Sequence, residues 1–373
     1  MSRHRLLELE RTCGHLILGG FASADLPGDF SVALARGRRA GAILFRRNLP
    51  SATAAHALCV AIASAAPGTP PLIGIDQEGG RVARLGDPVV RLPPMRRLAQ
   101  TRDAWLLENA ALLVARQLRA LGFNLDFAPV LDVDSNPENP VIGDRSFGST
   151  PQAVMAAARP FLRGLLRAGM PPCAKHFPGH GDTSIDSHVA LPTVSRSASS
   201  LHRLEIEPFR RLLSLPCWMS AHVFYPSLDP VSPATLSATI LTGIARRQLR
   251  FKGIMFSDDL EMGAVRGLAS IEELAVAAVR AGCDVLLVCS DWALQERALE
   301  ALVRQAEREE AFRVRCQVAA ERSQALRCRW PPNAATTSRV AADLRAQPVA
   351  SQVIARLEPL LQSGSSPPNG SSI

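Results

Sequence analysis

The segment 175–188, KHFPGHGDTSIDSH, concentrates side chains that can do chemistry. Its fourteen residues include three histidines, two aspartates and a lysine. That lysine is unusual, because the chain contains only two lysines, Lys175 and Lys252, beside forty arginines. Lysine presents a compact, rotatable ammonium, whereas arginine presents a planar fork, and the two are not interchangeable at a shaped polar site. We therefore predict that Lys175 serves such a site.

Asp186 and His188 stand two residues apart at the end of this segment. In a turn, the carboxylate can approach the imidazole, orient its tautomer and favour its charged form, which is what a histidine general acid/base requires. The alternative is that the three histidines bind a metal or only hydrogen-bond within the loop. The segment lacks HxH and HExxH spacing, and its glycines would fix a ligand set poorly. A metal-dependent hydrolase therefore ranks below a metal-free one.

A second acidic element is GIMFSDDLEM (253–262), an apolar run that ends in Asp258 and Asp259. Side chains alternate along a strand, so only one of the two carboxylates points easily into a common site. The other would anchor the loop. A carboxylate in this place can attack an electrophilic carbon or bind a metal, and the alternative is that both acids cap the following helix.

Two further segments carry charged groups suited to a hydroxyl-rich ligand. PLIGIDQEGGRVARL (71–85) places Asp76 before a Gly-Gly turn, with Arg81 and Arg84 behind it, and IGDRSFG (142–148) adds Arg145. Ionised acceptors and fixed donors can hold a diol in one orientation, and the glycines permit a tight turn. The alternative is that these acids and arginines only close their own loops.

Short apolar runs alternate with helical patterns along most of the chain, as in repeated βα units around a parallel sheet. The helical patterns span 104–121, 154–168, 201–213, 236–248 and 271–281. The predicted strands are 15–18, 41–45, 72–76, 123–128, 172–175, 217–220, 253–256 and 285–288. Eight strands with intervening helices predict an α/β fold of the TIM-type (β/α)8 barrel class, in a single domain.

The positions of the polar residues support this topology. Asp76, the segment 132–145, the segment 175–188, His222 and Asp258 follow the third to seventh predicted strands in turn. Barrel enzymes carry their chemistry on the loops at the C-terminal ends of strands. These groups are therefore predicted to meet at one rim.

The C-terminal part shows no second βα series. One long helix is predicted over about 294–326, a break at residues 330–332, WPP, and a pair of weakly amphipathic helices over 338–361. The last residues, SGSSPPNGSSI, have the composition of a disordered tail. We predict a catalytic barrel with capping helices over 1–330, followed by a helical extension and tail over 331–373.

Composition excludes several classes of protein. The net charge of +8 is spread over isolated arginines, and aromatic residues are scarce, so no nucleic-acid partner is expected. No segment reaches the roughly 18 apolar residues of a membrane span, and no membrane association is expected. The eight cysteines are scattered without a CxxC pair, which is typical of a reduced, cytoplasmic protein.

Taken together, KHFPGHGDTSIDSH, IDQEGGRV and FSDDLEM resemble the glycoside hydrolase family 3 β-N-acetylglucosaminidases. AILFRRN (42–48), FNLDFAPVLDV (123–133) and IGDRSFG also match in the family's order, so the resemblance covers roughly residues 10–290. The chain is similar to the short, single-domain cytoplasmic form that releases N-acetylglucosamine from anhydro-muropeptides in peptidoglycan recycling. No cofactor or metal is implied, the expected partner is a small carbohydrate, and a monomer is favoured.

The resemblance also implies roles for individual residues. Asp258 would be the nucleophile, His188 the acid/base and Asp186 its dyad partner. The residues implied to bind the sugar are Asp76, Arg84, Arg145, Lys175 and His176. The implied reaction is retention through a covalent glycosyl-enzyme.

Other functions remain open from the residues alone. No side chain in the sequence must read an N-acetyl group, so a β-glucosidase or β-xylosidase of the same family is the first alternative. A non-catalytic sugar-binding protein is disfavoured, because all the proposed catalytic residues are present.

Overall fold

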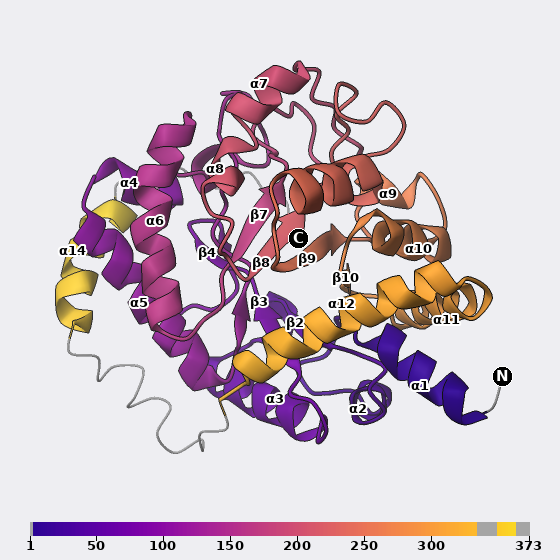
Figure 1. Cartoon of the computed structure of the whole chain (residues 1–373). Coiled ribbons are helices and arrows are strands. Elements are labelled where there is room, and N and C mark those ends of the chain that lie inside the picture. Colours follow the sequence, from indigo (N-terminus) through magenta and orange to yellow (C-terminus); the bar gives the residue numbers. More distant parts are fainter. Residues whose placement is uncertain (1–2, 334–348, 363–373) are drawn as a thin grey trace.

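The fold is known from a computed structural model that describes residues 3–333 and 349–362. Its centre is an eight-stranded, all-parallel sheet in the order β6-β3-β2-β1-β10-β9-β8-β7. The strands are β1 (Ile17–Gly19), β2 (Gly41–Leu44), β3 (Leu72–Ile75), β6 (Leu125–Asp126), β7 (Cys173–Phe177), β8 (Cys217–Ser220), β9 (Ile254–Asp259) and β10 (Val285–Val288). Parallel bridges Asp126↔Pro172 and Val130↔Lys175 join the two edges. The sheet is a TIM-type barrel, as predicted (Figure 1).

Helices surround the barrel, and one of them crosses its end (Figure 1). They are α1 (Arg3–Gly14), α2 (Gly28–Ala35), α3 (Ala52–Ser64), α4 (Met95–Gln100), α5 (Ala104–Leu121), α6 (Pro151–Arg167), α7 (Ala198–Arg203), α8 (Glu207–Arg210), η4 (Thr239–Gln248), α9 (Gly263–Arg266), α10 (Ile271–Ala281), α11 (Trp292–Arg308), α12 (Glu310–Arg329) and α14 (Ala350–Gln362). Short 3-10 turns occur at η1 (Arg46–Asn48), η2 (Gly143–Arg145) and η3 (Ala234–Leu236), and a hairpin, β4 (Gln77–Gly79) with β5 (Val82–Ala83), follows β3.

Local signals explain where several helices begin and end. Asp103 caps α5 by accepting a hydrogen bond from the amide of Leu106, and Gly122 ends that helix at φ 103°. Ser270 and Glu273 form a reciprocal capping box at the start of α10. The predicted ranges 104–121 and 271–281 match these two helices at both ends.

Two predicted helices are wrong in their continuity. The range 201–213 is divided between α7 and α8, because Pro208 has no amide hydrogen and fits only the first turn of a helix. The single helix predicted over 294–326 is two helices, with Glu309 between them in an extended conformation at φ −129°. The segment holds no Pro or Gly near residue 309 that would have marked this break.

Helix α12, the long orange helix in Figure 1, closes the end of the barrel where the strands begin. Leu326 joins the apolar cluster inside the barrel, and Arg327 donates a hydrogen bond to the carbonyl of Ala40, just before β2. Asn124, just before β6, donates to the carbonyl of Trp330 at 2.8 Å. The C-terminal part of α12 is therefore part of the barrel core.

Charge reinforces this closure. Asp284, fully buried at the start of β10, accepts from Arg315 and Arg322 of α12 at 2.9 and 3.1 Å and from Arg246 of η4 at 2.5 Å. A buried carboxylate needs partners of opposite charge, and here three arginines from two helices supply them.

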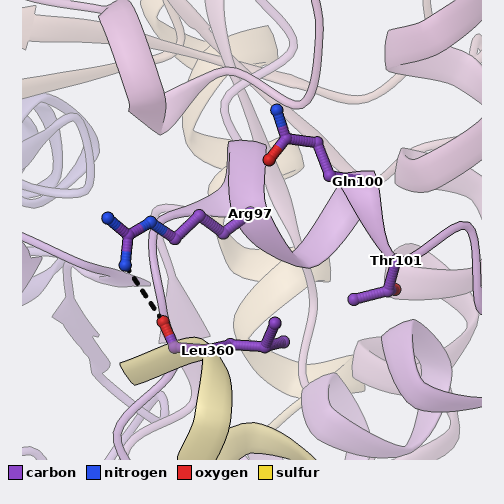
Figure 2. A pocket seen from close by; sticks show the side chains of 4 residues that line it. All are labelled: Arg97, Gln100, Thr101 and Leu360. Atoms are coloured by element: carbon purple, nitrogen blue, oxygen red, sulfur yellow. Dashed lines mark hydrogen bonds between the residues drawn. The ribbon is translucent and has the colours of Figure 1, made fainter. Parts of the chain in front are cut away.

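Beyond α12, the structure describes one more helix, α14, while residues 338–348 of the predicted pair and the predicted tail lie outside the described residues. Arg97 of α4 donates to the carbonyl of Leu360 at 3.2 Å. A hollow of about 320 Å³ beside this contact is lined by Arg97, Gln100, Thr101 and Leu360 (Figure 2). It shares no residue with the predicted site. No helix among the described residues is long and apolar enough to cross a membrane.

Candidate active site

Lys175 lies at the centre of a charged cluster at the C-terminal rim. Its ammonium is 2.8 Å from Asp76 and 2.6 Å from Glu78, and its side chain is 3% exposed. Arg145 binds the Glu78 carboxylate with two hydrogen bonds of 2.8 and 2.9 Å, and Arg84 lies 3.3 Å from Asp76. The structure thus brings together four of the predicted residues from β3, the β4–β5 hairpin, β7 and η2.

Glu78 was not singled out in the sequence, and the hairpin explains its position. Gly79 and Gly80, at φ 125° and 56°, turn the chain back after β4, and Glu78 contacts the same ammonium as Asp76, with 1% of its side chain exposed. Burial opposes ionisation of Glu78, but Arg145 and Lys175 outweigh it and hold its pKa well below the usual range. Glu78 is therefore an anion that fixes the two cations.

Asp76 and Lys175 are both held in their charged forms. Burial would raise the pKa of Asp76, but Lys175 and Arg84 lower it below its ordinary value. Burial would lower the pKa of Lys175, but Asp76 and Glu78 raise it above its ordinary value. A permanent ammonium and a permanent carboxylate at the rim give a donor and an acceptor in fixed positions, as a vicinal diol needs.

His176, next in the chain, is held by a carboxylate that sequence analysis placed at the rim without a role. Asp132 accepts from the Nδ1 side of His176 at 2.7 Å and from the backbone amides of His176 and His180 at 3.0 and 2.7 Å. Burial would raise the pKa of Asp132, but the two histidines and these hydrogen bonds lower it. The imidazole of His176 is therefore fixed with Nε2 turned away from Asp132.

The loop after His176 is hydrogen-bonded throughout its first half. Tyr225 donates to the carbonyl of Gly179, and Asn139 donates to the carbonyl of His180. A Cβ at Gly181 would lie 1.7 Å from the carbonyl oxygen of Val133, so glycine is required for this close approach. The loop glycines therefore have a packing role that the sequence pattern did not reveal.

Asp186 and His188 form the pair that their spacing predicts. The Asp186 carboxylate accepts from both the amide and the Nδ1 side of His188, at 2.8 and 2.7 Å. Their side chains are 35% and 43% exposed. Burial opposes ionisation of Asp186, but the bonds to His188 lower its pKa. The pair keeps access to solvent, as a proton carrier requires.

The two acids at the end of β9 have different hydrogen-bonding surroundings, as alternation predicted. Asp259 accepts from the amides of Glu261 and Cys289 at 3.1 and 3.2 Å, and burial raises its pKa to about 7. The carboxyl of Asp258 has no such loop-anchoring bonds among those described, beyond the amide of Asp259. Burial would raise its pKa, but His176 and His222, and more weakly His188, lower it.

His222 and a backbone hydrogen bond connect the end of β9 to neighbouring segments of the rim. The imidazole of His222 is bonded through Nε2 to the carbonyl of Asp259 at 2.9 Å and through Nδ1 to Thr235 at 2.8 Å. The amide of Gly263, shortly after β9, donates to the carbonyl of His188 at 3.2 Å. An ionised carboxylate, a histidine–aspartate pair and a set of fixed charges therefore share one rim. Within the described part of the chain, no group of three His, Cys, Asp or Glu side chains is arranged to hold a metal ion.

Comparison with known proteins agrees with this geometry. Residues 29–323 match the model of the glycosyl hydrolase family 3 N-terminal domain. The chain belongs to glycoside hydrolase family 3. It is a glycosidase, and it is 43% identical over 266 residues to the beta-hexosaminidase of Pseudomonas aeruginosa strain PAO1, which covers 71% of this chain and 79% of that protein.

Solved structures extend the likeness over nearly the whole chain. A family 3 β-N-acetylglucosaminidase from Paenibacillus sp. is 36% identical with a TM-score of 0.88, covering 94% of this chain and 68% of that one. NagZ from Neisseria gonorrhoeae, in complex with N-trifluoroacetyl-D-glucosamine, is 32% identical with a TM-score of 0.77, covering 92% of this chain and 97% of that one.

Proposed function

We propose that the protein is a retaining exo-β-N-acetylglucosaminidase in which Asp258 is the nucleophile and His188 is the acid/base. The observation that carries this proposal is that Asp258, whose pKa lies below its usual value, ends the strand whose following turn is bonded to the backbone of the exposed Asp186–His188 pair. The names of the relatives, a beta-hexosaminidase and a β-N-acetylglucosaminidase, support the choice of sugar.

In the first step, an oxygen of Asp258 attacks the anomeric carbon while His188 gives its proton to the departing glycosidic oxygen. In the second step, neutral His188 removes a proton from water as the water attacks the glycosyl-enzyme, and Asp258 is released. Asp186 accepts from the Nδ1 side of His188 in both steps, which leaves Nε2 for the exchanged proton. Both inversions together retain the β-configuration.

The charged cluster would bind the non-reducing sugar. In this proposal Lys175 and Arg145 supply donors, His176 offers its Nε2 as a hydrogen-bonding partner, and Asp76 accepts from sugar hydroxyls, while Arg84 holds Asp76 in place. Because the ion pairs of the cluster fix its side chains, little reorganisation should accompany binding. The substrate that we propose is N-acetylglucosaminyl-anhydromuramyl peptide, which places the reaction in cytoplasmic peptidoglycan recycling.

Replacing Asp258 is the direct test. Asp258→Ala should reduce turnover of a chromogenic N-acetyl-β-glucosaminide by about 10⁴-fold or more, as expected for loss of a covalent nucleophile. Asp259→Asn is the matched control, because the amide oxygen can still accept the loop bonds, and it should retain most of the activity. Near wild-type turnover by Asp258→Ala would exclude the proposed nucleophile.

The substrate is tested separately. The enzyme should release N-acetylglucosamine as the β-anomer, seen by proton NMR, and should turn over the aryl N-acetylglucosaminide far faster than the aryl glucoside and xyloside. A preference for either of the latter would favour the alternative sugars. Product analysis on the anhydromuramyl peptide then tests the natural substrate, and an unchanged rate after exhaustive chelation is expected for a metal-free reaction.

A further inference from the structure

His180 is a buried histidine in the loop between His176 and His188. The proposed reaction does not use it. Its amide donates to Asp132 at 2.7 Å, and its ring is 1% exposed. On one side of the ring, Nδ1 is 2.9 Å from the hydroxyl of Thr183, and on the other, Nε2 is 3.1 Å from the hydroxyl of Ser187. The ring therefore spans the loop from its fixed first half to the residue between Asp186 and His188.

This ring is suited to a structural contact and unsuited to proton transfer. Burial, together with neighbouring His176, lowers its pKa to about 4, so it stays neutral near neutral pH. A neutral imidazole donates at one nitrogen and accepts at the other, and a hydroxyl can do either. Thr183 and Ser187 can therefore satisfy both nitrogens in either tautomer, and the bridge does not depend on pH in the range where enzymes of this kind work.

Ser187 holds the Asp186–His188 pair from two directions. Its carbonyl accepts from the amide of Ala264 at 3.0 Å, which attaches the backbone to the turn after β9. Its hydroxyl contacts His180, which leads through Asp132 to His176 in the sugar-binding cluster. The first contact fixes the pair relative to the segment that follows Asp258. The second connects the pair to the residues proposed to bind the sugar.

We infer that His180 is a positioning residue that fixes the Asp186–His188 pair relative to the sugar-binding cluster through its contact with the Ser187 hydroxyl. This inference rests on the proposed acid/base role of His188. Loss of the contact should let His188 move from the glycosidic oxygen while Asp258, Lys175 and the barrel stay in place. Proton donation to the leaving group should suffer, and sugar binding should not.

Leaving-group dependence distinguishes this role from a general structural one. A 2,4-dinitrophenyl aglycone departs without a proton, whereas a 4-methylphenyl aglycone needs one, and kcat/KM reports the step in which the aglycone leaves. His180→Asn can keep a polar atom near Thr183 but cannot reach Ser187. It should lower kcat/KM for the 4-methylphenyl substrate about 10- to 100-fold, which is part of the roughly 10²- to 10⁴-fold that general acid catalysis supplies, and for the dinitrophenyl substrate less than about 3-fold.

Three further single variants and one double variant complete the test. His180→Gln places its amide near the position of Nε2 and should recover a large part of the lost rate, and Ser187→Ala should reproduce the selective loss, without adding to it in the double variant with His180→Asn. His56→Asn is the matched control, because His56 is a buried histidine on α3 whose ring nitrogens have no hydrogen-bond partner, and it should leave both substrates unaffected.

Equal losses on both aglycones in His180→Asn, or no loss on either, would overturn the inference. The same measurement on His188→Ala separates it from the proposed function. If His188→Ala lowers kcat/KM equally for the two aglycones, the acid/base assignment itself fails. If His188→Ala shows the selective loss and His180→Asn does not, only the positioning role fails.

Discussion

Two histidine–aspartate pairs lie at the rim of the barrel with the same 2.7 Å contact and in opposite surroundings. In His176–Asp132 the side chains are 7% and 0% exposed, and the carboxylate also accepts two backbone amides. In His188–Asp186 they are 43% and 35% exposed, and the carboxylate accepts one amide besides the ring. Distance alone therefore does not define the role of such a pair. The buried pair should carry stability and the exposed pair should carry proton transfer.

Removing the buried carboxylate should have the largest effect. Asp132→Ala leaves His176 and two buried amides without an acceptor, and loss of one partner of a buried pair costs about 3–5 kcal/mol of unfolding free energy. Urea denaturation followed by circular dichroism measures this value. Asp186→Ala is the matched control. A loss below about 1 kcal/mol for Asp132→Ala would show that the two pairs do not differ as proposed.

Asp186→Ala should instead reduce activity with the fold intact. Without the carboxylate, His188 loses the group that orients its ring, so kcat/KM for an aryl N-acetylglucosaminide with a poor leaving group should fall about 10²- to 10³-fold, or roughly 3–4 kcal/mol of transition-state stabilisation. Added azide should rescue the glycosyl-enzyme of the dinitrophenyl substrate and yield the β-glycosyl azide. An α-azide product, or undiminished turnover, would contradict the assignment.

The pH dependence of the unfolding free energy should come from buried carboxyl groups near the buried pair. Glu205 is fully buried, has one carboxylate oxygen without a hydrogen-bond partner, and lies near Asp132, and burial raises its pKa to about 8. Between its ordinary pKa of about 4.3 and about 8, the unfolded chain is ionised at this group and the folded chain keeps the proton. Stability therefore falls as pH rises through this window, by about 1.4 kcal/mol for each pH unit at most.

Glu205→Gln removes this contribution. The variant should match wild type near pH 4 and exceed it by on the order of 1–4 kcal/mol at pH 8, measured by urea denaturation at both pH values. Burial also raises the pKa values of Asp126 and Asp259 to about 7. These two groups lower the unfolding free energy with rising pH in wild type and in Glu205→Gln alike, so their effect cancels when the two proteins are compared. A constant difference across the pH range would count against the buried proton.

The smallest effect should be the contribution of the exposed pair to stability. A double-mutant cycle with Asp186→Ala and His188→Ala should give a coupling energy of about 0–1 kcal/mol, and added salt should reduce it further. The same cycle with Asp132→Ala and His176→Ala should give a clearly larger, salt-insensitive coupling. Equal couplings in the two cycles would remove the distinction between the pairs.

Sequence patterns predicted those features that depend on neighbours in the chain. Apolar runs located the eight strands, the spacing of Asp186 and His188 predicted their contact, and strand alternation separated Asp258 from Asp259. The scarcity of lysine directed attention to Lys175, which lies at the centre of the charged cluster. Apart from the lysine count, which is a property of the whole chain, each signal lay within a few residues.

Features that depend on distant contacts could not be predicted in this way. Glu78 acquires its role from Arg145, 67 residues away, and Asp132 from His176, 44 residues away. Nothing in the sequence distinguishes His180 from other loop histidines, and only the structure shows its contact with Ser187. The roles proposed for Asp258, His188 and the sugar-binding residues remain predictions that the experiments above address.

The position of α12 has a consequence for how the protein is made. The helix supplies Leu326 to the barrel interior and hydrogen-bonds to residues just before β2 and β6. These early strands therefore cannot complete their packing until α12 has been synthesised. Domains generally fold as units during synthesis. We therefore expect the nascent barrel to stay open and protease-sensitive on the ribosome until residue 330 has left the exit tunnel, which chains stalled before and after α12 would reveal by limited proteolysis.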